Sequence, residues 1–378
     1  MPDRRFDVAI VGGGPAGCAA GLSLRSHASG LSAVLCEASA YDGPRIGETL
    51  PPPARRILEH LGVWESFRRQ GHREVHGTAA AWGSAVLWEH DFLFTTQGAG
   101  WHLDRTAFDA MLAKEAEQRG VVLRRRTRVR GVEKNEGGWR LRLTGGGFLS
   151  ARFLVDATGA SASLARRCGT RFESSDRLTA FVRLFEETEE RDPRSSVEAF
   201  SDGWWYTAGL PGGLRIAACL TDADLARGLR LGDPSGWLRL LGEADRVSAL
   251  LQGARPQGPV TIRAAQSRLL APAAGLGWLA VGDAASLFDP LSAQGILKGL
   301  RAGIFASYAI ADLLEKGDEN GLARYDRFVR DEHASYLRVR EKYYAEEQRW
   351  PESVFWNRRA VADGAATSPA SAGWRGRE

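Results

Sequence analysis

The chain has 378 residues, of which 44% are hydrophobic and 25% charged, so it is long enough for one large domain or two domains with sizeable cores. The net charge of +4 is spread over the chain without a basic block, which argues against nucleic acid as a partner. Four scattered cysteines predict neither a disulfide framework nor a metal site, and the absence of a long apolar run or signal peptide predicts a cytoplasmic protein without a membrane span.

The first predicted elements are a strand at 6–11 and a helix from Ala16 to about Arg25. The glycines between them, Gly12, Gly14 and Gly17, fit the spacing G-x-G-x-x-G. In that spacing the first glycine allows a tight turn, the second lets a pyrophosphate approach, and the third lets the helix pack on the strand. The turn and the helix start, including Pro15 and Ala16, therefore predict a phosphate cradle.

A second strand is predicted at 31–36, and it ends at Glu37, twenty residues beyond Gly17. A carboxylate at this distance can bind the ribose hydroxyls of an adenine dinucleotide. The alternative is a strand, turn and helix without a ligand.

A long proline-rich loop follows at 42–53 and leads into a helix at 54–61. Loops of this length in compact domains are often functional. Arg45 and Glu48 are therefore candidates to hold a ribityl or adenosine group, with a solvated loop as the alternative.

The middle of the chain is predicted to be rich in strands. Short strands are expected within 76–94, and a helix with Asp104 as its N-cap is expected to run to Arg119. The segments 121–132, 139–143 and 148–149 are interpreted as a small meander, followed by a separate strand at 151–155 that ends in Asp156 and Gly159. Residues 172–265 are expected to form a mainly antiparallel domain with one helix at 235–241.

Near the C-terminus a strand at 277–281 ends in Gly282 and Asp283, and a long helix is predicted from Gly295 to Lys316. Asp283 at a strand end can accept hydrogen bonds from ligand hydroxyls, and the helix start offers free N–H groups. Further helices are expected around 321–349, and the tail from residue 360 is expected to be disordered.

Three features occur in order: the glycine turn with Glu37, Asp156-Ala-Thr-Gly159, and Gly282-Asp283 followed by Asp289-Pro-Leu-Ser-Ala-Gln-Gly-Ile296. Together they resemble the FAD-dependent enzymes of the para-hydroxybenzoate hydroxylase fold. The resemblance covers residues 1–60 and 100–315. It implies an α/β fold in which a Rossmann-like FAD-binding domain carries an inserted, mainly antiparallel β-sheet substrate domain and C-terminal helices.

The implied domains are discontinuous. The FAD-binding domain would comprise 1–71, 100–165 and 270–316, and the substrate domain 72–99 and 166–269. Residues 317–359 would form the C-terminal helical segment, and 360–378 the disordered tail.

The resemblance also implies roles for single residues. The glycine turn and Glu37 would bind the ADP half of FAD, with Arg105 and the backbone near Val129 on the pyrophosphate or adenine side. Asp283 would hold ribityl oxygens, and the amides of Gly295 and Ile296 would face the N1–O2 edge of the flavin. The other expected cofactor contacts are Arg45, Glu48, Asp156, Gly159, Gly282, Pro290 and Gln294.

Within this superfamily, Arg45-Ile-Gly-Glu-Thr-Leu-Pro51 and Trp101-His-Leu-Asp-Arg105-x-x-Phe-Asp109 are most similar to the halogenase-related branch. That branch includes flavoproteins that modify a tryptophan of a partner protein during tryptophylquinone formation, the partners of lysine and glycine oxidases. The implied reaction is hydroxylation of an aromatic ring, an indole or tryptophan, through a flavin hydroperoxide. The substrate is either free or presented on a partner protein.

Three alternatives stay open. Halogenases of this branch need a lysine in the strand after the first lid region, but the first lysine here is Lys114, and the corresponding strand carries His76. An ene-reductase of the geranylgeranyl type would need a long apolar tunnel, which the polar, tryptophan-rich stretch 200–212 disfavours. The third alternative is a binding module that retains FAD without catalysis.

The catalytic candidates are His76, chosen over His90 and His102 as a base, and Trp205, which could line the pocket with its neighbours Trp204 and Tyr206. Alternation along a strand would send Trp204 and Tyr206 to one face and Trp205 to the other. The expected co-substrates are O2 and either NAD(P)H or reduced flavin from a separate reductase, because the sequence has no second G-x-G-x-x-G unit.

Overall fold

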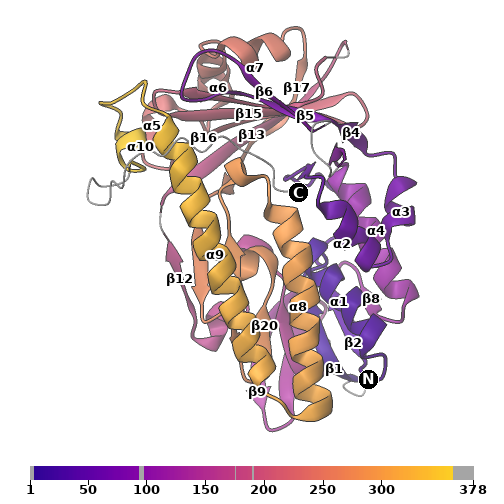
Figure 1. Ribbon diagram of the computed structural model, residues 1–378. Helices are drawn as coiled ribbons and strands as arrows, with labels where there is room; N and C mark the ends of the chain where they lie inside the picture. The colour runs from indigo at the N-terminus through magenta and orange to yellow at the C-terminus, as the bar shows by residue number, and fades with distance from the viewer. Residues whose placement is uncertain (1–3, 93–97, 175, 190, 361–378) are drawn as a thin grey trace, which may run out of the picture.

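The structure is a computed structural model that describes residues 4–92, 98–174, 176–189 and 191–360. Figure 1 shows two parts, with α1, α8 and the strands around β1 in the lower part and a second sheet above them. The long helix α9 runs along both parts. This mixed α/β architecture with C-terminal helices confirms the predicted fold class.

The lower part is built on an eight-stranded sheet with the order β19-β20-β11-β1-β2-β8, to which β10 and β9 are added as a hairpin beside β11. Its strands are β1 (Arg4–Val11), β2 (Ala33–Cys36), β8 (Val122–Arg124), β9 (Val129–Asn135), β10 (Gly138–Leu143), β11 (Phe148–Asp156), β19 (Ala274–Gly275) and β20 (Trp278–Ala280). The central strands are parallel and buried on both faces, which explains their continuous apolar sequences.

The register places the carboxyl ends of four parallel strands in one row. Val11 of β1 pairs with Cys36 of β2 and with Asp156 of β11, which in turn pairs with Ala280 of β20. The segments that follow these strands therefore meet at one edge of the sheet, where open α/β sheets bind their ligands.

Two sequence-based element predictions are wrong in this region. The stretch 121–132 contains two strands, β8 in the parallel sheet and β9 in the hairpin, because the turn between them changes the pairing partner. Residues 148–156 form one continuous strand, β11, whose first half pairs with β10 and whose whole length pairs with β1.

The helices α1 (Pro15–His27) and α8 (Gly295–Lys316) pack closely beside this sheet. Small residues allow the approach: a Cβ on Gly303 would lie only 2.4 Å from the carbonyl oxygen of Ala16, and one on Gly299 would lie 3.5 Å from the Ala16 Cβ. The starts of the two helices consequently lie side by side.

The upper part is a seven-stranded sheet with the order β17-β13-β16-β15-β14-β5-β6. Its strands are β5 (Gly77–Ala81), β6 (Trp88–Asp91), β13 (Leu178–Glu186), β14 (Ser195–Phe200), β15 (Gly203–Leu210), β16 (Leu214–Asp222) and β17 (Arg255–Ala264). All pairings are antiparallel except that of β14 with β5. The helices α6 (Pro234–Leu241) and α7 (Asp245–Leu250) cover its outer face (Figure 1).

The remaining elements belong to neither of these two sheets. They are α2 (Ala54–His60), α3 (Trp64–Arg68), α4 (Arg105–Gln118), α5 (Leu225–Leu229), α9 (Asn320–Glu346) and α10 (Val354–Asn357), with a small sheet of β3 (Thr49–Leu50), β7 (Gly100–His102) and β4 (Arg73–Val75) and another of β12 (Arg171–Ser174), β18 (Arg268–Ala271) and β21 (Ser286–Leu287).

The expected N-cap of α4 is present, since the Asp104 side chain accepts the N–H of Ala107.

Within the described ranges, none of the helices combines the length and the apolar character needed to cross a bilayer. The predicted disordered tail, residues 360–378, lies outside the described residues except for Ala360.

Candidate functional site

The glycine turn lies between β1 and α1, at the edge where the parallel strands end. Gly12 has a φ of +113°, and a Cβ there would lie 2.1 Å from the carbonyl oxygen of Ala157, so only glycine fits. Gly17 is equally constrained, because its Cβ would lie 2.1 Å from the Gly12 oxygen.

Gly14 differs from these two glycines, because a Cβ there would meet nothing within 4 Å. It is the N-cap of α1, no side chain caps the helix, and Pro15 follows at the first helical position. The first N–H groups of α1 therefore face open space at the strand ends, an arrangement that fits a pyrophosphate.

Glu37 lies beside this turn as predicted, at the end of β2. Its carboxylate accepts the N–H of Gly13 at 2.8 Å, the N–H and hydroxyl of Ser39 at 2.9 and 2.6 Å, and the guanidinium of Arg45 at 3.1 Å. Burial by itself would raise the pKa of Glu37, but these hydrogen bonds and the Arg45 charge outweigh it and hold the pKa below its usual range. Glu37 is thus an ionised acceptor beside the glycine turn.

Arg45 and Arg105 converge on one buried carboxylate, Asp109. Arg45 approaches it at 2.8 Å, and Arg105 approaches it at 3.2 and 3.3 Å while donating to the carbonyls of Ile46 and Gly47. The two arginines thereby fix the loop after β2 against α4.

Sequence reasoning named both arginines as cofactor contacts but did not single out Asp109. Its position one helical turn after Arg105 was the available signal, because residues at i and i+4 share a helix face.

Asp156 ends β11 in the same row, but its carboxylate is engaged by its own loop. It accepts the N–H and hydroxyl of Thr158 and the N–H groups of Leu164 and Ala165, at 2.6 to 3.0 Å. Gly159 follows with open space where a Cβ would be, whereas Val129 is half-buried at the start of β9. Asp156 therefore shapes the loop that brings Gly159 to the edge.

Gly282 and Asp283 follow β20 and lie on the first turn of α1. A Cβ on Gly282 would lie 2.7 Å from the Ala16 Cβ, which accounts for a glycine here. The Asp283 carboxylate is 40% exposed and forms an ion pair at 2.9 Å with Lys298, whose side chain is only 2% exposed. Lys298 also donates to the Ser286 carbonyl and lies 4.6 Å from the ring centre of Phe288.

The start of α8 offers a second set of uncapped N–H groups. Gln294 is its N-cap without a side-chain hydrogen bond, Gly295 has open space around its Cβ position, and Ile296 is buried. Pro290 is exposed at the start of the preceding 3-10 turn. The predicted residues of this motif are thus together at one helix start.

Asp289 anchors this motif to α9. Its buried carboxylate accepts the Tyr344 hydroxyl at 2.8 Å and the Arg340 guanidinium at 3.1 Å, and it caps the turn through the N–H of Leu291. Burial raises the pKa of Asp289 although Arg340 opposes the shift. These contacts hold the segment before α8 in place.

The inner face of the seven-stranded sheet meets the lower part over an aromatic surface. Trp204 and Tyr206 of β15 lie on this face in one apolar cluster with Ile46 and Leu291, and Trp204 donates its indole N–H to the Tyr344 hydroxyl at 3.0 Å. The Tyr206 hydroxyl lies 2.8 Å from that of Thr49.

The two catalytic candidates are not brought to this surface. Trp205 points to the outer face, as the alternation of β15 predicts, and packs edge-to-face on Trp237 of α6 with ring centres 5.0 Å apart. His76 is exposed in the link between β4 and β5.

His102 of β7 contacts the upper sheet directly, since it is fully buried between Ser195 of β14 and the Gly209 carbonyl of β15, each at 2.9 Å. Burial lowers the pKa of His102 to about 4, so its imidazole is neutral at physiological pH. Sequence reasoning had considered His102 but preferred His76.

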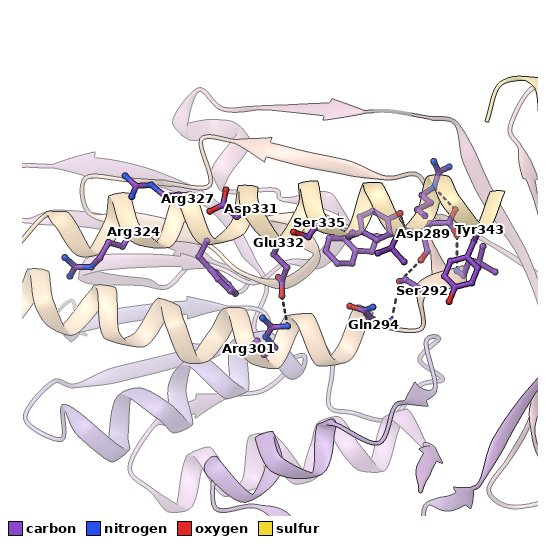
Figure 2. Close-up of a pocket in the computed structure, with 16 residues that line it drawn as sticks. Asp289, Ser292, Gln294, Arg301, Arg324, Arg327, Asp331, Glu332, Ser335 and Tyr343 are labelled. Atoms are coloured by element: carbon purple, nitrogen blue, oxygen red, sulfur yellow. Dashed lines mark hydrogen bonds and ion pairs between the residues drawn. The ribbon is translucent and has the colours of Figure 1, made fainter. Parts of the chain in front are cut away.

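A separate groove of about 770 Å³ runs between α8 and α9 (Figure 2). It is lined by Phe288, Asp289, Leu291, Ser292, Gln294, Arg301, Arg324, Arg327, Phe328, Asp331, Glu332, Ser335, Tyr336, Val339, Arg340 and Tyr343. Arg301 and Glu332 form an ion pair at 3.1 Å across it, which Figure 2 shows as a bridge between the helices. The groove touches the site only through the segment before α8.

Comparison with known proteins agrees with this geometry. The FAD binding domain family profile matches residues 5–217. LodB of Marinomonas mediterranea, which is named as an FAD-dependent oxidoreductase, is 30% identical to this chain over 363 residues. The matched region covers 94% of this chain and 96% of LodB.

Two solved structures share the fold over nearly the whole chain. The myxobacterial chondrochloren halogenase CndH is 25% identical with a TM-score of 0.87, covering 95% of this chain and 87% of CndH. The peptidyl tryptophan dihydroxylase QhpG is 24% identical with a TM-score of 0.78, covering 98% of this chain and 82% of QhpG. The chain therefore belongs to the FAD-binding domain family and is an FAD-dependent oxidoreductase, with flavin-dependent halogenases among its relatives.

Proposed function

We propose that the protein is a monooxygenase that hydroxylates an aromatic substrate of the indole class, either a free indole or a tryptophan side chain of a partner protein. The glycine turn, Glu37 and the start of α8 would hold FAD. The Gly14 position supports this fit, because the space that a Cβ would fill is open while the flanking glycines are tightly packed. When bound, FAD supplies the electrons that activate O2.

The observation that carries hydroxylation is the composition of the inner sheet face. Trp204 is fully buried in this face, whereas Tyr206 beside it is only partly buried, and its aromatic ring would suit an aromatic substrate. The five lysines of the chain lie elsewhere: Lys114 in α4, Lys134 in β9, Lys298 and Lys316 in α8, and Lys342 in α9. A halogenase of the kind described above would need a lysine in the strand after the first lid region, where this chain has His76.

A halogenase is the second candidate, because CndH shares both the fold and a quarter of the sequence. In this chain Lys298, a buried lysine of α8, forms an ion pair with Asp283 and donates a hydrogen bond to the Ser286 carbonyl. It is therefore not available to handle an oxidised halide.

The reaction is tested on the FAD-loaded protein with a reduced flavin or NAD(P)H donor, labelled O2, a halide salt, and either indole or a tryptophan-containing partner. Mass spectrometry is expected to find one or two labelled oxygen atoms in the product. A halogenated product would favour the second candidate. Turnover without O2 would contradict both and favour an ene-reductase, and flavin that no donor reduces would leave only a binding module.

A further inference from the structure

Glu48 is a buried carboxyl at the junction of the two parts of the molecule. It directly precedes β3, whose Thr49 pairs with His102 of β7, and its carbonyl accepts the N–H of Leu103 at 2.9 Å. β3 also packs against α8. Glu48 is therefore held where β3 and β7 meet α8 and the inner face of the upper sheet.

The carboxyl of Glu48 has few polar partners for a buried acid. It is 4% exposed, and it accepts the Gly47 N–H at 2.8 Å and the N–H of its own backbone. Among the described residues no cation forms an ion pair with it, since the nearest guanidinium, that of Arg105, is engaged by Asp109 and two loop carbonyls. Asp109, by contrast, is shared by two arginines.

Burial accordingly raises the pKa of Glu48 to about 7, with Arg105 opposing the shift. The other groups that face it are on the upper sheet and β7. Tyr206 of β15 lies within its field, because the Glu48 charge adds to burial in raising the pKa of Tyr206. Arg215 and Ser195 also act on Tyr206, and Ser195 is hydrogen-bonded to the neutral His102.

We propose that Glu48 takes up one proton when the bound flavin is reduced. Reduction would add two electrons from the donor and one proton to the flavin ring. One negative charge would then remain beside α8, the helix against which β3 packs. A second negative charge on a neighbouring buried carboxylate is unfavourable in a medium of low dielectric constant, so the carboxylate binds a proton from solvent and becomes neutral. Reoxidation by O2 removes the electrons and releases that proton.

This inference rests on flavin binding and not on the identity of the substrate. The test is the dependence of the flavin midpoint potential on pH, from about pH 6 to about pH 8, around the titration range of Glu48. Below about pH 7 the Glu48 carboxyl is already protonated beside oxidised flavin, so the unmodified protein is expected to take up one proton per two electrons there and two protons per two electrons above it. In Glu48→Gln, which keeps the shape but cannot ionise, the slope is expected to stay at one proton per two electrons over the whole range. Glu65→Gln is the matched control, because Glu65 is 67% exposed on α3.

Equal slopes in the unmodified protein and Glu48→Gln would overturn the proposal. A second measurement covers the case in which the variant fails to bind FAD. Infrared difference spectra of the unmodified FAD-loaded protein with isotope-labelled glutamate, recorded at about pH 8 where Glu48 is ionised beside oxidised flavin, should show a protonated carboxyl band that appears on reduction. Absence of that band would also overturn it, whereas failure to hydroxylate an indole would affect only the proposed reaction, because neither measurement contains substrate.

Discussion

Gly12 and Gly14 lie two residues apart and have different physical roles. Gly12 is required by the fold, since its positive φ and the nearby Ala157 carbonyl exclude any side chain. Gly14 has an ordinary φ of −78° and an empty Cβ position, so the apoprotein does not require glycine there. A requirement for Gly14 must therefore come from a ligand.

We expect Gly14→Ala to fold with an unchanged thermal midpoint but to bind FAD about tenfold or more weakly, because the new methyl group occupies the space at the start of α1. Titration of the apoprotein with FAD, followed by flavin fluorescence, measures the loss. Gly30→Ala is the matched control, since Gly30 also has an open Cβ position but lies away from the turn. Equal FAD affinity in both variants would contradict the assignment of this cradle.

At the scale of the element, successive side chains of β15 alternate between the two faces of its sheet, and the two faces have different roles. Trp205 belongs to the cluster under α6 and α7, whereas Tyr206 faces the lower part and touches Thr49 of β3. Adjacent residues on one strand should therefore respond differently to the same substitution.

Trp205→Leu is expected to lower the free energy of unfolding by about 1–3 kcal/mol, because it leaves a cavity against Trp237 in a well-packed cluster. Tyr206→Leu is expected to raise KM for the aromatic substrate by roughly tenfold, because it changes the surface that would contact the ring. Urea denaturation and steady-state kinetics on both variants check the two effects. The opposite assignment of effects would show that the substrate lies elsewhere.

At the scale of the whole molecule, the inner faces of the two parts enclose polar groups whose charge states burial controls. Glu48 titrates near neutral pH, whereas His102 stays neutral down to about pH 4. Both lie where β3 and β7 join the upper sheet to the lower part. The pH dependence of global stability should report on this junction.

The sign for His102 follows from its lowered pKa. Below about pH 6.5 the imidazole is protonated in the unfolded chain but stays neutral in the folded protein, whose His102 pKa is about 4. The neutral, buried His102 therefore contributes its full stability above about pH 6.5, and the free energy of unfolding decreases as the pH falls toward about 4. We expect His102→Gln to lose less stability over this interval than the unmodified protein, by up to about 3 kcal/mol. Urea denaturation at several pH values measures the difference. His90→Gln, at an exposed histidine of β6, should behave like the unmodified protein.

Local patterns in the sequence determined the parts of the site that depend on backbone conformation. The glycine turn, the row of strand ends at Glu37, Asp156 and Asp283, and the limits of α8 follow from short-range chemistry, because glycine, strand and helix preferences act within a few residues. The alternation of β15 was also predictable, although which of its faces lies toward the lower part was not.

Only the tertiary structure decided which side chains meet. Asp109 gathers Arg45 and Arg105 from separate segments, and Lys298 is buried against Asp283, fifteen residues earlier in the chain. Trp205 was a candidate by adjacency alone, but α6 and α7, which follow later in the sequence, cover its face. Such contacts depend on burial and long-range packing, and these are settled when the two sheets and α8 come together rather than by the order of residues.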